Sequence, residues 1–253
     1  MPVLATEAIV LHSFRYLESS RILRLVTRDA GVLSVIARGA RRARSAVGGG
    51  VDLFAQGTAQ LILKDGRDLH TLSAFDVARP RRLLGSDLAR FTGAAVLAEL
   101  VLRVGHGSDS AELFDTLALA FDQIATVPAE QADEAALSGA WLLVRQLGFA
   151  PVLDACSACR AVIPPGDRCI FSARAGGVLC ARCAPQHAPG RALPGEARAS
   201  IAEWSTGAHV WPLPVREARA HQRVLREFLD EHLGDGRPWR AFEAWEHGGW
   251  EDT

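Results

Sequence analysis

Four cysteines in two CxxC pairs are the residues of this chain whose spacing specifies a chemistry most clearly. Cys156 and Cys159 form the first pair, and Cys180 and Cys183 follow after 20 intervening residues. Two such pairs at this separation can fold back so that four thiolates surround one tetrahedral Zn²⁺. Because four thiolates complete the ligand set, no position is left for an activated water. We therefore expect one structural zinc ion that contributes to local folding.

The same cysteines allow two other interpretations. A pair of disulfides is disfavoured in a reducing cytosol, and a dithiol redox centre needs only one CxxC in a thioredoxin-like setting. Cys169 and His187 lie close enough along the chain to replace one of the four ligands. We expect neither to do so, because Cys169 precedes the β-like run Ile170-Phe171, where a small buried thiol is the commoner role.

A run of arginines is the second chemical signal. Arg38, Arg41, Arg42 and Arg44 lie between two predicted strands. Three consecutive glycines follow them at 48–50. Guanidinium groups on a glycine-rich connection can contact successive phosphates without a fixed register, which favours sequence-independent nucleic-acid binding. A solvated basic loop produces the same pattern. Arg79, Arg81 and Arg82 either extend this basic surface or belong to an exposed linker.

Charge is distributed unevenly along the chain. The net charge of −1 argues against a polyanionic partner, but residues 1–82 hold 13 Lys/Arg against 7 Asp/Glu, and the remaining residues hold 15 against 22. The excess positive charge therefore lies in the segment that carries the arginine run. Base stacking also needs exposed rings, and the alternation of residues places Phe54 and Phe75 in the core. Tyr16 is left as a stacking candidate.

The predicted elements of the first third are short strands. β-like runs separated by turn signals cover 6–13, 21–27, 32–37, 55–63 and 69–75. The segments 29–31 and 64–66 each end in glycine and predict hairpin turns, because glycine accepts the positive φ that such turns demand. Five strands in this length suit a small closed barrel. An OB-fold and an SH3-like barrel both fit, and strand counting does not separate them.

After residue 82 the apolar period changes from two to about 3.6, which predicts a helical bundle. Apolar residues at i, i+3 and i+4 spacing mark helices over 88–102, 113–124, 136–147 and 225–233. Ser110 and Asp109 are cap candidates for the second of these, and Pro128 ends it. Most of the six tryptophans, all of which lie beyond residue 140, are expected to anchor helix packing.

Sequence patterns of the common nucleotide-binding and hydrolase sites are missing, including GxxxxGK[ST], GxGxxG, GxSxG and HExxH. We therefore expect no enzyme. The N-terminus has no basic leader before its apolar stretch, and the longest apolar helix candidate, 94–104, falls short of the ~20 residues needed to cross a bilayer. We expect a soluble, intracellular protein without membrane contact.

Five sequence blocks, taken in order, carry a resemblance to a known family. They are AIVLHSFRYLESS from Ala8, LVTRDAGVLS from Leu25, ARGARR from Ala37, GFAPVLDACSAC from Gly148 and GGVLCARC from Gly176. In this order they resemble the RecO family of bacterial DNA repair proteins over essentially the whole chain. The joint order is far more specific than any single block.

The resemblance implies an α+β fold. A five-stranded OB-fold barrel is expected at the N-terminus, followed by an all-helical domain with an inserted four-cysteine zinc finger. The expected boundaries are 1–80 for the barrel, 81–152 and 188–253 for the two parts of the helical domain, and 153–187 for the zinc finger. The expected site residues are Cys156, Cys159, Cys180 and Cys183 for the metal and Arg38, Arg41, Arg42, Arg44, Arg15 and Tyr16 for DNA.

The resemblance also implies a function in recombinational repair. Such a mediator binds single- and double-stranded DNA, anneals complementary strands, and works with RecR and single-strand binding protein to load RecA at gaps, in the cytoplasm at the nucleoid. The pocket for the tail of single-strand binding protein lies in the helical region of relatives, and no residues here match it. Two other hypotheses remain: a thiol redox enzyme or zinc-regulated switch that uses the CxxC pairs, and a scaffold whose barrel binds a peptide.

Overall fold

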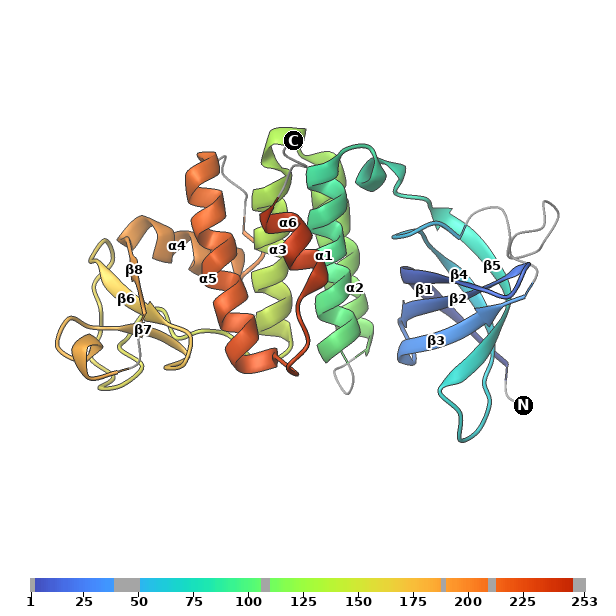
Figure 1. Ribbon diagram of the computed structural model, residues 1–253, viewed down its shortest axis with the longest axis horizontal. Coiled ribbons are helices and arrows are strands. Elements are labelled where there is room, and N and C mark those ends of the chain that lie inside the picture. The colour runs from blue at the N-terminus through green and yellow to red at the C-terminus, as the bar shows by residue number, and fades with distance from the viewer. Residues whose placement is uncertain (1–2, 39–50, 106–109, 188–189, 209–212, 248–253) are drawn as a thin grey trace.

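The computed structural model describes residues 3–38, 51–105, 110–187, 190–208 and 213–247. Figure 1 shows an elongated molecule with a β-barrel at one end, a bundle of helices in the middle and a small β-sheet module at the other end. The barrel and the small module lie on opposite sides of the bundle. No helix among the described residues is long and apolar enough to cross a membrane.

Five strands form the barrel, and the sequence analysis located each of them. They are β1 (Val3–Tyr16), β2 (Ser20–Thr27), β3 (Gly31–Ala37), β4 (Gln56–Ile62) and β5 (Leu69–Arg79). The barrel closes in the order β1-β2-β3-β5-β4, with β3 and β5 parallel and the other pairs antiparallel. This strand order, with the parallel β3–β5 pair, is that of the five-stranded Greek-key barrel called the OB-fold. The SH3-like alternative is therefore set aside.

Glycines make the two predicted turns possible. Gly31 and Gly66 have φ values of 64° and 65°, in the left-handed region that a side chain disfavours. The strands they connect send alternate apolar residues into the barrel, where Leu23, Leu25 and Leu61 are fully buried. The barrel interior is thus built from the period-two pattern of the sequence.

A β-bulge reverses the alternation of β1 halfway along the strand. The β1–β2 register shifts between Val10 and His12. Before the bulge, Val10 faces the barrel interior, while its neighbours Ile9 and Leu11 pack against the helices. After it, Ser13 lies opposite the interior residue Leu23. The second half of β1 therefore turns its odd-numbered residues toward the barrel interior and its even-numbered residues outward.

Six α-helices follow the barrel in the described chain. They are α1 (Leu88–Val104), α2 (Ser110–Thr126), α3 (Ala132–Gln146), α4 (Gly195–Trp204), α5 (Val215–Leu233) and α6 (Arg240–Glu246), with 3₁₀ turns η1 (Arg82–Gly85), η2 (Ala129–Gln131) and η3 (Ala184–Gln186). The four helices predicted from periodicity are α1, α2, α3 and α5. Neither α4 nor α6 was predicted.

Small residues bring the central helices together. A Cβ atom added at Gly139 of α3 would lie 2.9 Å from Cβ of Ala120 on α2, and one added at Gly93 of α1 would lie 2.7 Å from Cβ of Ala136 on α3. Both distances are too short for a side chain, so the glycines let the helices approach closely.

Buried tryptophans fill the space around these helices. The four that the structure describes are all at most 2% exposed, which confirms them as packing anchors: Trp141, Trp204, Trp239 and Trp245. Trp211 and Trp250 lie outside the described residues.

The chain forms a three-stranded sheet between α3 and α4. It contains β6 (Cys169–Ser172), β7 (Gly177–Leu179) and β8 (Arg191–Leu193) in the order β7-β6-β8. Phe171 of this sheet contacts Phe228 of α5, with ring centroids 6.0 Å apart. The apolar core of the small sheet is therefore continuous with that of the helices.

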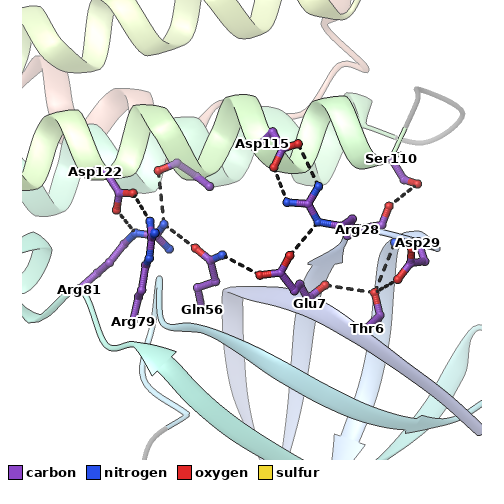
Figure 2. A network of polar contacts seen from close by, with 11 residues as sticks. Thr6, Glu7, Arg28, Asp29, Gln56, Arg79, Arg81, Ser110, Asp115 and Asp122 are labelled. Atoms are coloured by element: carbon purple, nitrogen blue, oxygen red, sulfur yellow. Dashed lines mark hydrogen bonds and ion pairs between the residues drawn. The ribbon is translucent and has the colours of Figure 1, made fainter.

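Polar contacts join the barrel to α2 (Figure 2). Arg28, at the end of β2, donates from Nε to Glu7 at 2.8 Å and from a terminal nitrogen to Asp115 of α2 at 2.9 Å. Arg79, the last residue of β5, and Arg81, two residues later, both donate to Asp122 of α2 at 2.7 Å. The barrel is thus connected to the same helix at two points.

The structure corrects one expectation at this junction and confirms another. Arg81 is only 8% exposed and is bound to Asp122 and to Gln56, so it belongs neither to a basic surface nor to an exposed linker. Phe54 is buried as expected, but it packs against Phe121 of α2 rather than inside the barrel. Both residues lie where two domains meet, and that position depends on tertiary contacts.

Candidate functional site

The four cysteines of the CxxC pairs come together in one cluster. The Sγ atoms of Cys156, Cys159, Cys180 and Cys183 all lie within 4.8 Å of one another, and those of Cys159 and Cys180 are 3.9 Å apart. Tetrahedral zinc with Zn–S bonds of about 2.3 Å requires sulfurs about 3.8 Å apart. The cluster therefore has the size and the donor set of a four-thiolate metal site. All five cysteines of the chain are free of disulfides.

A tight backbone turn within each CxxC pair brings its two sulfurs to the same side. The N–H of Arg160 donates to the carbonyl of Cys156 at 2.8 Å, and that of Cys183 donates to the carbonyl of Cys180 at 3.0 Å. Gly177, at φ 154°, brings the two halves together, because a Cβ there would lie 2.2 Å from the carbonyl oxygen of Val152. The sequence signal for the ligands was the CxxC spacing, whereas Gly177 was noted only as part of the block that begins at Gly176.

The pKa values of the four thiols are perturbed in different directions, and a bound cation would favour the thiolate form of all four. Burial raises the pKa of the Cys156 thiol, but backbone N–H donors of Cys180, Cys159 and Ala158 outweigh burial and lower the pKa to about 6. Hydrogen bonds with the thiols of Cys159 and Cys180 raise the pKa of Cys183 to about 12. Four thiolates at these distances cannot all ionise without a positive ion between them.

Cys169 and His187 stay out of the cluster. The Cys169 thiol is buried and directed at the carbonyl of Leu193, 3.7 Å away. Nδ1 of His187 lies 2.9 Å from the carbonyl of Cys183, within hydrogen-bond distance of the backbone. Among the described residues, the four CxxC cysteines are the one cluster whose donor atoms could hold a metal ion.

A groove at the end of the barrel gathers arginines. It encloses about 500 Å³ between the barrel and the start of α1, and four guanidiniums and one carboxylate line it: Arg15, Arg21, Arg81, Arg82 and Asp52. Arg15 and Arg21 are directly opposite each other in the β1–β2 pair. Like charges in that position destabilise a sheet. In the described chain neither of them forms an ion pair, which leaves both available for an anion.

The outward face of β1 carries aromatic rings beside this groove. Phe14 is 48% and Tyr16 is 40% exposed, and they alternate with Arg15 along the strand. The imidazole of His12, with its pKa lowered by burial and by Arg24, lies 4.2 Å from the Phe14 ring between centroids. We call His12, Phe14 and Tyr16 the aromatic row. Sequence reasoning proposed Tyr16 alone, because it did not foresee the bulge that sets this alternation.

The arginine run is only partly within the described residues. Arg38 is exposed and directly follows Ala37, the residue of β3 that pairs with Arg21. It thus lies one strand away from the Arg15–Arg21 pair. Arg41, Arg42 and Arg44 lie outside the described residues.

Several barrel arginines serve the domain junction instead. Arg28, Arg79 and Arg81 pair with carboxylates of α2, and Arg24 donates to the carbonyl of Leu102 on α1 at 3.3 Å. Part of the positive charge counted in the sequence therefore holds the barrel to the helices. By contrast, Arg15, Arg21, Arg38 and Arg82 form no ion pair with a described residue.

Comparison with known proteins gives a consistent result. Residues 1–81 match the family model described as "Recombination protein O N terminal", and residues 85–240 match "Recombination protein O C terminal". A protein of Anaeromyxobacter sp. (strain Fw109-5) named DNA repair protein RecO is 35% identical over 89% of this chain and 90% of its own length. Proteins of the same name from Rubrobacter xylanophilus and Synechococcus elongatus are 34% and 31% identical over 72% and 90% of this chain, and over the same shares of their own lengths.

Proposed function

Because this chain belongs to the RecO family of DNA repair proteins, we propose that it binds single- and double-stranded DNA through its barrel and anneals complementary strands. Binding and annealing require no chemical step, so the proposed protein is a mediator rather than an enzyme. Its place would be the cytoplasm, at the nucleoid.

The arrangement of Arg15, Arg21 and Arg38 carries this proposal. Arg15 on β1 pairs with Arg21 on β2, Arg38 directly follows the neighbouring strand β3, and none of the three has a carboxylate partner in the described chain. Arg82 adds a fourth from the far wall of the groove. A sugar-phosphate chain that lies across this end would meet successive positive charges whatever its bases, as sequence-independent binding requires. The proposed site continues into Arg41, Arg42 and Arg44.

The aromatic row supports a preference for single strands. Rings that are 40–48% exposed offer faces on which unpaired bases can stack, and an alanine substitution at such a ring typically costs about 1–3 kcal/mol per base. Paired bases are already stacked within the duplex and cannot use these rings. Double strands would then depend on the arginines alone.

The cysteine cluster supports a structural role for one Zn²⁺. Cys156, Cys159, Cys180 and Cys183 would hold the ion, which would supply a cross-link between the two turns of the small module. The domain boundaries at residues 80, 152 and 187 belong to the same proposal. They place the zinc finger as an insertion in the helical domain.

The proposed partners follow from the family. RecR and single-strand binding protein, through its C-terminal tail, would act with this chain to promote loading of RecA at gaps. In this proposal the protein partners bind the helical domain, because the barrel is assigned to DNA. No residues of this chain are assigned to these contacts.

Fluorescence anisotropy with single- and double-stranded oligonucleotides tests the DNA site. We expect Arg15→Ala with Arg21→Ala to weaken binding to both forms and to flatten the dependence on salt by about 0.7 per lost contact to a single strand. The control is Arg240→Ala, which removes an exposed arginine on α6, far from the groove. Equal effects of the barrel and control variants, or none, would count against the site.

A further inference from the structure

A second group of arginines lines a pocket between α5 and α6. In Figure 1, α5 lies on the side of the helical bundle that is farther from the barrel. The first half of α5 and the end of α6 enclose a cavity of about 280 Å³. Its lining is Arg219, Gln222, Arg223, Arg226, Glu246 and His247. The volume is several times the ~30 Å³ of one water molecule.

Three guanidiniums share one face of α5 because their residues are four and three positions apart. Arg226 forms an ion pair with Glu246 at 3.0 Å. Arg219 and Arg223 are exposed and form no ion pair with any residue that the structure describes. Like charges one turn apart destabilise a helix. An anion between them would remove that repulsion.

Polar side chains without partners lie at the same cavity. Gln222 is 2% exposed, lines the cavity and has no hydrogen bond to another described residue. Nε of Arg226 is likewise buried without a partner. Oε1 of Glu246 lacks a donor as well, which a bound water would supply. Buried polar side chains in native proteins are nearly always satisfied. The unpaired amide donor of Gln222, with Arg219 and Arg223 in the same lining, therefore points to a ligand with acceptor oxygens.

We propose that the α5–α6 cavity binds a phosphate group. The guanidiniums of Arg219 and Arg223 would neutralise it, and the Gln222 amide would donate from the cavity lining. Glu246 positions Arg226 through their ion pair. A phosphate suits these donors better than a carboxylate, because its acceptor oxygens are tetrahedrally arranged and can meet donors from several sides.

The phosphate can belong to a nucleic-acid strand or to a free ion. The first source rests on the proposed function and would give a strand a contact distant from the barrel. The second does not depend on DNA binding. Both involve the same chemistry at the cavity.

Chemical protection of arginines tests the proposal on the unaltered, zinc-loaded chain. Phenylglyoxal modification is followed residue by residue by mass spectrometry, with inorganic phosphate, with a single strand bearing a 5′-phosphate, and with the same strand bearing a 5′-hydroxyl. We expect inorganic phosphate to protect Arg219 and Arg223. Arg216, exposed on the same helix but outside the cavity lining, should remain reactive.

The oligonucleotide arms identify the source. Protection by both strands indicates a backbone phosphate, protection by the 5′-phosphorylated strand alone indicates a strand end, and protection by inorganic phosphate alone indicates a free ion. Protection by a glutamate-rich peptide but not by any phosphate would overturn the proposal in favour of a carboxylate site. Absence of protection in every arm would also overturn it.

A charge-matched pair of variants gives a second readout. Arg219→Ala with Arg223→Ala should abolish the rise in Tm that phosphate produces, whereas Arg216→Ala with Arg240→Ala removes the same charge and should retain it. If DNA still binds the barrel while Arg219 and Arg223 remain reactive in all arms, this inference alone fails. If no DNA binds at all but inorganic phosphate protects, the proposed function fails and the site stands.

Discussion

Replacing Arg81 with Ala should destabilise the protein far more than replacing Arg79, its neighbour at the domain junction. The Arg81 side chain is 3% exposed and donates to Asp122 and Gln56, each at 2.7 Å, and to the carbonyls of Phe54 and Ala118 at 3.3 Å. Its removal leaves these acceptors without their donor. Breaking a buried ion pair from one side costs about 3–5 kcal/mol.

The expected loss is near the lower limit of that range. Asp122 is 36% exposed and keeps its second partner, Arg79, so its charge is not left unpaired. We therefore expect Arg81→Ala to lower the free energy of unfolding by about 3 kcal/mol. The free energy of unfolding of Arg81→Lys should lie between those of Arg81→Ala and the parent protein, because an ammonium group keeps the charge but cannot reach several acceptors at once.

Arg79 provides the matched control. It donates to the same carboxylate at the same distance of 2.7 Å, but its side chain is 61% exposed. Exposed pairs contribute at most about 1 kcal/mol, so Arg79→Ala should have little effect. The assay is urea unfolding of the zinc-saturated protein followed by circular dichroism, with an unchanged m-value as the condition for comparison. Equal losses for the two alanine variants would refute the reasoning.

Three further outcomes are expected. Cys159→Ser should reduce bound zinc well below one ion per chain and expose the other three thiols to alkylation; retention of equimolar zinc, or reversible disulfide formation in the metal-free parent, would contradict a structural site. Burial lowers the pKa of His221 to about 4 from the ordinary 6.5. The free energy of unfolding should therefore be unaffected by this side chain above pH 6.5, and it should fall by up to about 1.4 kcal/mol per pH unit as the pH decreases from 6.5 toward 4. His221→Phe should remove that part of the pH dependence in unfolding measurements, and an unchanged profile would disprove it. Phe14→Ala with Tyr16→Ala should weaken single-strand binding without altering its salt slope or duplex binding, as anisotropy titrations would show; an equal loss for duplex would exclude stacking.

Local patterns were sufficient to predict much of the fold. The turns at Gly31 and Gly66 and the strands beside them depend on neighbouring residues, and the barrel has both as expected. The CxxC spacing likewise predicted which four cysteines form the cluster. Helix α6, in contrast, has seven residues, too few for a 3.6-residue period to emerge, and its position depends on Trp245 donating to Asp133 at 2.7 Å across 112 residues.

The roles of individual arginines could not be read from the sequence. Arg21 and Arg28 are both basic residues of the β2 region, yet one lines the groove and the other holds α2 through Asp115. The difference depends on which face of the barrel the helices cover. The same applies to Phe14, whose outward position results from a one-residue bulge that no local pattern announced.

Titration of the parent protein with a fluorescent single-stranded oligonucleotide at two ionic strengths tests the central claim most directly. If unpaired arginines at the end of the barrel attract the phosphate chain, the logarithm of the affinity should fall steeply and linearly with the logarithm of salt concentration, with a slope of at least about −2 for three or more contacts. Binding that is indifferent to salt, or no binding at the lower ionic strength, would contradict it.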